Sequence, residues 1–353
     1  MNWQSPSDGH RLKVLILYNE PALSSDNPDA ASEAGVLESV EAVTSALANR
    51  GHGAHSLALG NSPELAAAAI LQLEPVDVVV NLFEGFGGVG RGEAEIAGLL
   101  ELCGHAITGS PPDCLALVRH KARTKWLLAG AGIPTADFAL IAADGPFDRA
   151  ALESLLAGGR LIVKPANEDA SLGISLDSVV DSYESLVEQI DTVRERYGPV
   201  LVERFIAGRE FNAGVLALPQ AEVLPLAEIE FGMAFPSDRQ IVTYDAKWAA
   251  DSDECLQTPV RCPADVPPQL AAEIRSVALA AFRITGCRDY ARVDMRMDAT
   301  GRVYVLEVNG NPDIGPTAGF ARGLRVAGIE YDTFIDRLVR TTHATRSRLR
   351  ATC

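Results

Sequence analysis

Four side chains near the C-terminal end of the chain have types and spacings that suit a metal site. Arg292 and Asp294 alternate with apolar residues in one stretch, and Glu307 and Asn309 do so in the next. If the two stretches pair as antiparallel strands, two carboxylates, an amide oxygen and a guanidinium lie together. Hard oxygen ligands of this kind suit Mg²⁺, which usually completes its shell with water and phosphate oxygens. The sequence therefore predicts a magnesium site on this hairpin.

The predicted site depends on the register of the hairpin. The pattern predicts strands at 290–297 and 303–309, with turn residues in Asp298–Gly301 between them. A loop of two or four residues would place Arg292 and Asp294 on the face that carries the acid of the second strand, whereas a loop of three would separate them. Strict alternation puts four residues of the second strand on one face: Val303, Val305, Glu307 and Asn309.

A solvated strand face is the ordinary alternative for alternating charged residues. Two features favour a site over that alternative. The second strand is otherwise very apolar, and Gly310–Asp313 breaks the chain directly after the acids. Acidic residues at the end of a buried strand, followed by a break in the chain direction, are typical of a binding site.

The composition restricts the class of protein and its partners. With 353 residues, 47% hydrophobic and 22% charged, the chain is long enough for two or three globular subdomains. A formal net charge of −16 argues against nucleic acid and against an anionic membrane surface as partners. The six cysteines include no Cys-x-x-Cys pair, so they indicate neither a zinc site nor a disulfide framework. Because we find no signal peptide and no run of roughly 20 apolar residues, we expect a cytoplasmic protein.

The elements that precede the hairpin predict a doubly wound α/β domain at the N-terminus. Strands expected at 13–18, 55–59 and 76–83 alternate with helices, the first of them at 32–50. The third strand is apolar on both faces, as in a parallel sheet that helices cover on each side. The remaining expected elements are helices at 111–129, 182–197, 267–285 and 331–340 and strands at 160–165, 200–205, 224–231 and 240–245.

A glycine motif follows the third expected strand. Gly85, Gly87 and Gly90 have the Gly-x-Gly-x-x-Gly spacing of a dinucleotide-binding fingerprint. That fingerprint should lie in the first strand–helix turn, with an acid after the next strand, and neither condition holds here. The motif therefore argues weakly for a nicotinamide or flavin oxidoreductase. We expect instead a loop whose backbone approaches a ligand, with Glu84 or Arg91 directed at the substrate.

The order of polar residues along the chain resembles one known family. Lys164 ends a strand before a loop of small residues at 167–175, and Glu203 ends another before Gly-x-Glu. An Asp and a Glu-x-Asn then follow on the hairpin, and no Walker-type phosphate loop is present. This order resembles the ATP-grasp superfamily, and specifically the D-alanine–D-alanine ligase family, from about Asp77 to Leu338.

The resemblance implies a fold of mixed α/β and α+β class. A doubly wound α/β domain at residues 1–118 would precede two α+β subdomains, at 119–206 and 207–353, that clamp ATP between two β-rich layers. The implied reaction activates a carboxylate as an acyl phosphate, which an amine then attacks as phosphate leaves. The implied partners are amino-acid or amino-acid-like substrates and a second copy of the chain, bound through the N-terminal domain.

The same resemblance gives roles to individual residues. Arg292 would steady the acyl phosphate, and Ser171 and Gly173 would belong to the loop that closes over the substrate. For Lys164 and Lys247, ordinary solvated lysines are the alternative. Asp294, Glu307 and Asn309 would bind the metal, which is expected to be two Mg²⁺ ions or Mn²⁺ in their place. ATP would be contacted by Lys121, Lys164 and Lys247 at the phosphates, by Glu203, Phe205 and Ile206 at the adenine, and by Glu210 at the ribose.

The residues expected to bind the amino-acid substrates depart from the family pattern. The Gly-Gly-x-Ser-x-Glu signature is absent after the first strand, and Glu33 is the candidate for the glutamate that binds the substrate amine. In the closing loop the first hydroxyl is lost at Ala170, and Trp248 stands where a tyrosine is expected. After the hairpin, Asp313 would repel an incoming carboxylate, and Ala318 replaces the serine that holds it.

These patterns predict an ATP-dependent carboxylate–amine ligase whose acid and amine need not both be D-alanine. An orthodox D-alanine–D-alanine ligase of cell-wall synthesis is the alternative within this class. A non-catalytic nucleotide-binding module is the alternative outside it, and the intact set of Arg292, Asp294, Glu307 and Asn309 argues against that module.

Overall fold

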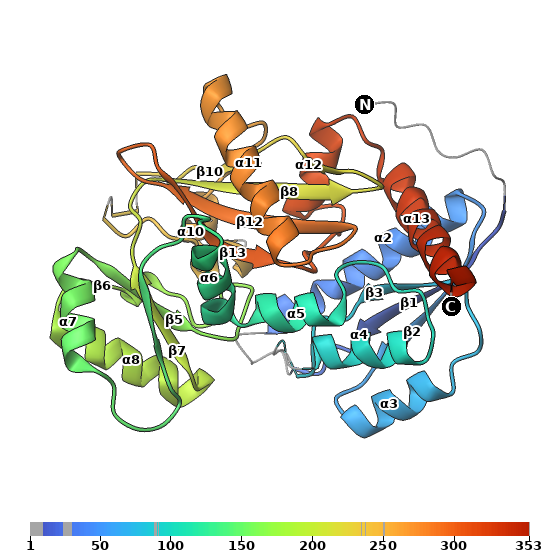
Figure 1. Cartoon of the computed structure of the whole chain (residues 1–353), viewed down its shortest axis with the longest axis horizontal. Helices are drawn as coiled ribbons and strands as arrows, with labels where there is room; N and C mark the ends of the chain where they lie inside the picture. The colour runs from blue at the N-terminus through green and yellow to red at the C-terminus, as the bar shows by residue number, and fades with distance from the viewer. Residues whose placement is uncertain are drawn as a thin grey trace.

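The computed structural model describes residues 10–23, 30–87, 90, 92–233, 235–236, 238–249 and 251–352. Within these residues the strands form a three-stranded, a four-stranded and a six-stranded sheet. Figure 1 shows the first sheet in blue and the second in green toward opposite ends of the molecule, with the third, in yellow and orange, beside both. None of the helices described is both long and apolar enough to span a membrane.

The N-terminal sheet is parallel, as predicted, with the strand order β2-β1-β3. Its strands are β1 (Lys13–Asn19), β2 (Gly53–Leu59) and β3 (Val78–Leu82), and the helices around it are α1 (Ala30–Ala34), α2 (Val36–Asn49), α3 (Pro63–Leu71), α4 (Glu93–Leu102) and α13 (Tyr331–Thr352). Successive side chains of a strand point to opposite faces. Val14 and Ile16 accordingly pack with α2 and α13, and Leu15 and Leu17 pack with α3 and α4. The buried side chains of α13 belong to a core cluster that includes both this sheet and residues of the C-terminal part, such as Leu216 and Tyr290.

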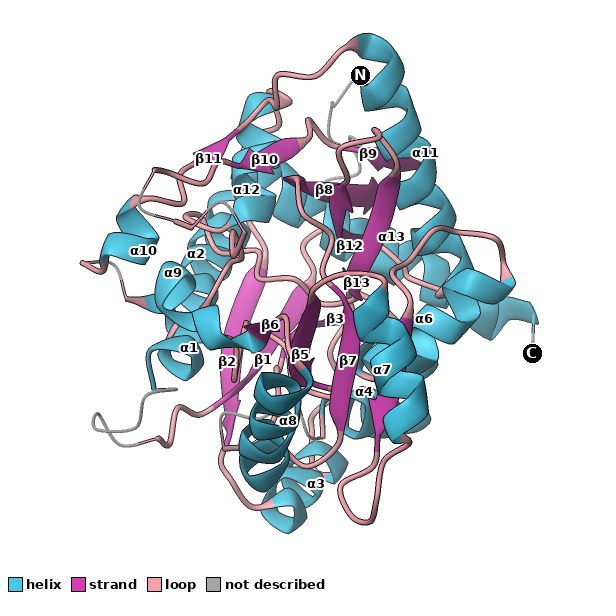
Figure 2. Cartoon of the chain, turned by 90° about the vertical axis from the view of Figure 1, so that its left-hand side faces the viewer, coloured by secondary structure: helices cyan, strands magenta, loops and turns pink. Residues whose placement is uncertain are grey.

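The central subdomain contains an antiparallel sheet in the order β4-β7-β5-β6. Its elements are α5 (Pro112–Arg119), α6 (Lys121–Gly130), β4 (Phe138–Ile141), α7 (Arg149–Ala157), β5 (Leu161–Pro165), the 3₁₀ turn Leu176–Ser178, β6 (Val179–Val180), α8 (Tyr183–Tyr197) and β7 (Val200–Arg204). Ser182 caps α8 by accepting a hydrogen bond from Ser185 N at 3.1 Å. Figure 2 shows α8 in front of β5 and β7, against which it buries Leu186 and Ile190.

The C-terminal sheet carries the hairpin at its edge. Its strand order is β11-β10-β8-β12-β13, with β9 also paired to β8. The elements are β8 (Arg209–Ala217), β9 (Ala221–Val223), β10 (Ala227–Ile229), α9 (Tyr244–Trp248), α10 (Asp253–Leu256), β11 (Val260–Arg261), α11 (Pro268–Ile284), β12 (Tyr290–Met297), β13 (Val303–Asn309) and α12 (Gly319–Val326). Helix α11 packs on one face of the sheet through Ile274 and Phe282, which leaves the opposite face available for a ligand.

The structure differs from the expected elements in several places. The helix expected at 111–129 is divided at His120, whose ψ of 86° is not helical. The strand expected at 240–245 is wrong, because Thr243 accepts a hydrogen bond from Ala246 N at 3.1 Å and thereby starts helix α9. Strand β8 had no predicted counterpart, since Asn212 and Gly214 interrupt its apolar pattern.

Candidate active site

A β-bulge in β13 determines how the two strands of the hairpin face each other. Beside the loop, Met297 pairs with Val303, so that residues 298–302 form the connection. The register then shifts between Met295 and Asp294, with Leu306 as the extra residue of β13. As a result Asp294 lies directly opposite Glu307.

The bulge also decides which residues of β13 face the cavity. Val303 and Val305 are buried in the core beneath α11, whereas Glu307 and Asn309 line the cavity. The prediction that these four residues share one face was therefore wrong, because one extra residue reverses the alternation. The prediction that the polar residues of both strands lie together is confirmed, since Asn309 lies opposite Arg292.

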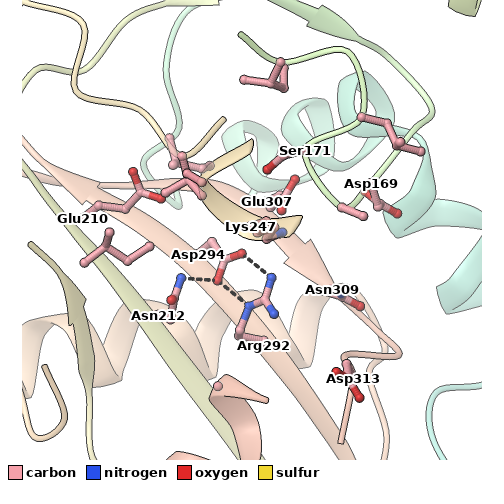
Figure 3. Close-up of a pocket in the computed structure, with 18 of the residues that line it drawn as sticks. Asp169, Ser171, Glu210, Asn212, Lys247, Arg292, Asp294, Glu307, Asn309 and Asp313 are labelled. Carbon is pink, nitrogen blue, oxygen red and sulfur yellow. Dashed lines mark hydrogen bonds and ion pairs between the residues drawn. The ribbon is translucent and has the colours of Figure 1, made fainter. Parts of the chain in front are cut away.

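Asp294 is held by two neighbours in the sheet (Figure 3). Arg292 donates two hydrogen bonds to it, from Nε to Oδ1 and from Nη2 to Oδ2, each at 2.8 Å. Asn212, which lies opposite Asp294 on β8, donates from Nδ2 to Oδ1 at 2.7 Å. These bonds fix the orientation of the carboxylate before any ligand arrives. Asn212 was missed from the sequence, where a polar residue on an unrecognised strand gave no signal.

Glu307 lies within a group of cations. Its Oε2 is 3.7 Å from Lys121 Nζ. Burial would raise the pKa of Glu307, but the charges of Lys121, Lys164, Lys247 and Arg292 lower it to about 2. The carboxylate is therefore ionised at neutral pH. Burial, followed by the charge of Arg292, lowers the pKa of Lys247 itself.

Two lysines enclose the buried carboxylate of Glu203. Lys125 Nζ lies 2.6 Å from Glu203 Oε2, and Lys164 is ion-paired with Oε1 of the same group. Burial would raise the pKa of Glu203, but the two ammonium groups lower it. Lys121 and Lys125, on the helix expected at 111–129, are both buried, although basic residues on a helix are usually solvated. The four-residue spacing of these lysines, which places them on one helix face, was the available signal.

The expected adenine and ribose contacts are arranged around Arg296, a residue that the sequence did not identify. Arg296 donates to Glu210 Oε2 and to the backbone oxygen of Ile206, both at 2.9 Å. Its guanidinium carbon lies 5.0 Å from the ring centroid of Phe205 and 5.5 Å from that of Phe231. Arg296 therefore joins β12 to the segment that connects the two subdomains.

The loop predicted to close over the substrate has an unusual backbone. Ala170 and Ser171 adopt positive φ values of 57° and 62°, which residues other than glycine rarely do. Two contacts hold the loop: Lys121 donates to Asp169 Oδ1 at 2.7 Å, and Trp248 Nε1 donates to the backbone oxygen of Ala170 at 3.0 Å. The loop thus lies against Trp248, the residue that stands where a tyrosine was expected.

Two expected substrate contacts are anchored by hydrogen bonds. Glu33 is buried, and its Oε2 accepts from the backbone nitrogens of Ala22 and Leu23 at 2.8 and 2.7 Å. Asp313 Oδ1 accepts from Ser39 Oγ and from Gly315 N, each at 2.7 Å. The second bond closes a turn directly after the hairpin, so the Asp313 carboxylate is engaged in positioning this turn.

Carboxylates are crowded at the end of the cavity next to the N-terminal domain. Burial, together with Asp313 and Asp169, raises the pKa of Glu84 to about 7. Glu93, which the sequence did not identify, accepts a hydrogen bond from Asn311 Nδ2 at 3.0 Å. Burial raises its pKa to about 8. Arg91, the alternative to Glu84, lies outside the described residues.

Most of the predicted site residues line one cavity of about 670 Å³. This volume is typical of small-molecule sites. Gly173 is not among the lining residues. Its φ is 72°, and a side chain at this position would collide with the ring of Tyr197. The predicted residues that line the cavity are Glu33, Glu84, Lys121, Lys164, Ser171, Glu203, Phe205, Ile206, Glu210, Lys247, Trp248, Arg292, Asp294, Glu307, Asn309 and Asp313.

The chain is similar to known proteins over most of its length. The family described as "D-ala D-ala ligase C-terminus" matches residues 127–340. The uncharacterized protein y4sG of Sinorhizobium fredii is 32% identical over 75% of this chain and 74% of its own length. D-alanine–D-alanine ligase B of Chromobacterium violaceum is 32% identical over 85% of this chain and 90% of its own.

Solved structures show the same fold. The crystal structure of the D-alanine–D-alanine ligase from Bacillus anthracis complexed with ATP matches with a TM-score of 0.75 at 21% identity, covering 96% of this chain and 99% of that one. The expected architecture, a doubly wound α/β domain followed by two α+β subdomains, is thereby confirmed. The chain belongs to the D-alanine–D-alanine ligase family and is an ATP-grasp ligase.

Proposed function

We propose that this ligase uses ATP to join a carboxylate to an amine, and that the acid and the amine need not both be D-alanine. The observation that carries this proposal is the contrast between two sets of residues that line the cavity. The set around Glu307 keeps the residues expected to handle nucleotide and metal. Ala170, Trp248 and Ala318, which also line the cavity, stand where the resemblance implies hydroxyl groups that contact the amino-acid substrates.

ATP is the proposed phosphoryl donor. The likeness to an enzyme of the same family that was crystallised with ATP supports this assignment. Phe205 and Ile206, held by Arg296, would border the adenine, and Glu210 would bind the ribose hydroxyls. Glu203 would accept from the adenine amino group while it remains paired to its two lysines. The phosphates would be bound by Lys121, Lys164 and Lys247.

Mg²⁺ is the proposed metal, held by Asp294, Glu307 and Asn309. The donor set fits this ion, because Glu307 is ionised and Asp294 Oδ2 accepts a single hydrogen bond from the described residues. The described residues contain no group of three His, Cys, Asp or Glu side chains that could hold a metal ion by themselves. The remaining positions would thus fall to phosphate oxygens and water, as is usual for Mg²⁺. When bound, the metal neutralises negative charge on the transferring phosphoryl group.

The proposed reaction has two steps. Transfer of the γ-phosphoryl group to the acid gives an acyl phosphate and ADP. Attack of a neutral amine on the acyl carbon then forms the amide, while phosphate leaves and the nitrogen loses a proton. Lys247 and Arg292 line the cavity beside Glu307 and would stabilise the developing negative charge. Ser171, on the loop above, would help to hold the phosphate and exclude water.

An orthodox D-alanine–D-alanine ligase remains the second candidate, because several relatives of about 30% identity carry that name. An ADP-release assay over a panel of D- and L-amino acids and dipeptides separates the two candidates. We expect efficient turnover to need an acid or an amine other than D-alanine. Efficient turnover of D-alanine alone would contradict the proposal that the acid and the amine need not both be D-alanine. If ADP release depends on the acceptor for none of the pairs, the ligase function itself is contradicted.

We also infer a homodimer formed through the N-terminal domain, as the family resemblance implies. Leu65 and Leu71 on α3 are 73% and 67% exposed, and Leu102 at the end of α4 is 87% exposed. These exposed leucines are available for contact with a second copy of the chain. Light scattering during gel filtration tests this, and a monomeric mass at micromolar concentration would contradict it.

A further inference from the structure

Arg322 lines the cavity on the first turn of α12, and neither the sequence patterns nor the family resemblance gives it a role. Its backbone nitrogen donates to the oxygen of Ala318 at 3.0 Å, so one helical turn separates the two residues. Its side chain is half-buried and belongs to the cavity wall. Ala318 stands where related ligases carry the serine that holds a carboxylate, and it cannot donate a hydrogen bond from its side chain.

Arg322 differs from Arg292 and Arg296 of the hairpin in having a guanidinium that is free to bind a ligand. Arg292 is neutralised by Asp294 at 2.8 Å, and Arg296 by Glu210 at 2.9 Å. For Arg322 the described part of the chain provides neither an ion pair nor a side-chain hydrogen bond. A guanidinium on the cavity wall that has no carboxylate partner can accept a ligand carboxylate as its partner.

Asp313 does not supply that acceptor. Its Oδ1 is bound to Ser39 and to the backbone nitrogen of Gly315, each at 2.7 Å, which directs the carboxylate toward α2. The repulsion that we expected between Asp313 and a substrate carboxylate is thus confined to the side of the cavity next to the N-terminal domain. Arg322, on α12, lines the same cavity and carries the opposite charge.

We propose that Arg322 binds the carboxylate of the amine substrate and replaces the hydroxyl lost at Ala318. The planar guanidinium can donate two parallel hydrogen bonds to a carboxylate, which fixes the orientation of the acceptor as well as its charge. The acceptor is therefore an amino acid, or another amine with a free carboxylate, and not a simple amine or an amino-acid amide. This inference rests on the proposed ligase function and specifies its second substrate.

Binding measurements test the inference without requiring turnover. The full chain, saturated with Mg²⁺ and the non-hydrolysable analogue AMP-PNP, is titrated calorimetrically with D- and L-amino acids and with the amide of each. We expect at least one acid to bind the wild type about 10- to 100-fold more tightly than its amide, which is the usual range for a charge-assisted hydrogen bond. Arg322→Gln should remove this difference and leave the affinity for the amide and for AMP-PNP unchanged.

Arg325→Gln provides the matched control on the same helix. Arg325 is exposed and donates to the backbone oxygen of Pro316 at 3.0 Å, outside the cavity. This variant should keep the full preference for the acid. The inference is overturned if the wild type shows no preference for any acid over its amide, or if the preference survives in Arg322→Gln. Ligase activity is measured separately by ADP release, so a failure of the proposed function would be distinguished from a failure of the carboxylate contact.

Discussion

Asp294 lies directly opposite Glu307 in the β12–β13 ladder because Leu306 adds one residue to β13 between the loop and the site. If Leu306 paired with Asp294 in a regular ladder, Glu307 would pair with Val293 and point toward the core beneath α11, where Val303 and Val305 lie. A bulge at this position therefore has a chemical purpose: it turns the acid toward the cavity while the valines nearer the loop stay buried.

Deleting Leu306 should accordingly leave the site in place. In the shortened strand Glu307 still pairs with Asp294, and a regular ladder keeps it on the cavity face. Deleting Val308 instead should bring Asn309 opposite Val293 and turn it onto the core face. We expect Mg²⁺-dependent nucleotide binding, measured by calorimetry, to persist in the first variant and to be lost in the second. Equal effects of the two deletions on nucleotide binding would contradict the role of the register.

Replacing Glu307 by Gln removes the negative charge that faces four cations. The variant should lose roughly 10²–10³-fold in kcat, as expected when a group that stabilises the transition state is removed. Binding of AMP-PNP without divalent metal should persist, since the lysines remain. The ADP-release assay and calorimetry measure these quantities, with Glu222→Gln on the exposed strand β9 as the control. An unchanged kcat would show that Glu307 is not a metal ligand.

Replacing Lys125 by Met should destabilise the central subdomain. Lys125 is 1% exposed and pairs with Glu203 at 2.6 Å, so its loss leaves part of a buried carboxylate uncompensated. The expected cost is about 3–5 kcal/mol. Adding Glu203→Gln should recover part of it, because no unpaired charge then remains. Differential scanning calorimetry checks both variants, and equal destabilisation in the single and double variants would contradict this account.

Asp289 should make stability depend on pH. Burial raises its pKa to about 6, although Arg288 and hydrogen bonds from Gly109 N and Thr342 oppose this. The folded state therefore keeps a proton that the unfolded state releases near pH 4, and the free energy of unfolding falls as pH rises through about 4 to 6.

Replacing Asp289 by Asn removes this dependence. Asn tolerates the positive φ of 57° at this position and keeps the oxygen that accepts from Gly109 N. The variant should gain stability relative to the wild type above about pH 6 and gain none below about pH 4. Thermal unfolding across this range measures the difference, with the exposed Asp144→Asn as the control. A difference that does not change with pH would contradict the buried ionisation.

Much of the fold could be predicted because the apolar runs are unambiguous. The strands β1 and β3 are buried on both faces, and this pattern is typical of a parallel sheet. The site residues of the hairpin could also be identified from their alternation. The extra residue Leu306 could not, since a bulge leaves no mark in the hydrophobic pattern of a seven-residue strand.

The residues that were missed depend on partners distant in sequence. Arg296 binds Glu210, and Lys125 binds Glu203, pairs that the topology of the sheets brings together. Asn212 reaches Asp294 through the pairing of β8 with β12. A basic or polar residue in isolation is ordinarily interpreted as solvated surface, so these contacts become visible when the strand order is known.

The central claim is that the hairpin holds a divalent cation against the phosphates of a nucleotide. Crystals of the full chain grown with AMP-PNP and Mn²⁺, measured at the manganese absorption edge, test it most directly. An anomalous peak within bonding distance of Asp294, Glu307 and Asn309 and of the phosphate oxygens is the predicted result. Ordered nucleotide density with no anomalous peak at these three residues, or a peak bound elsewhere, would contradict the claim.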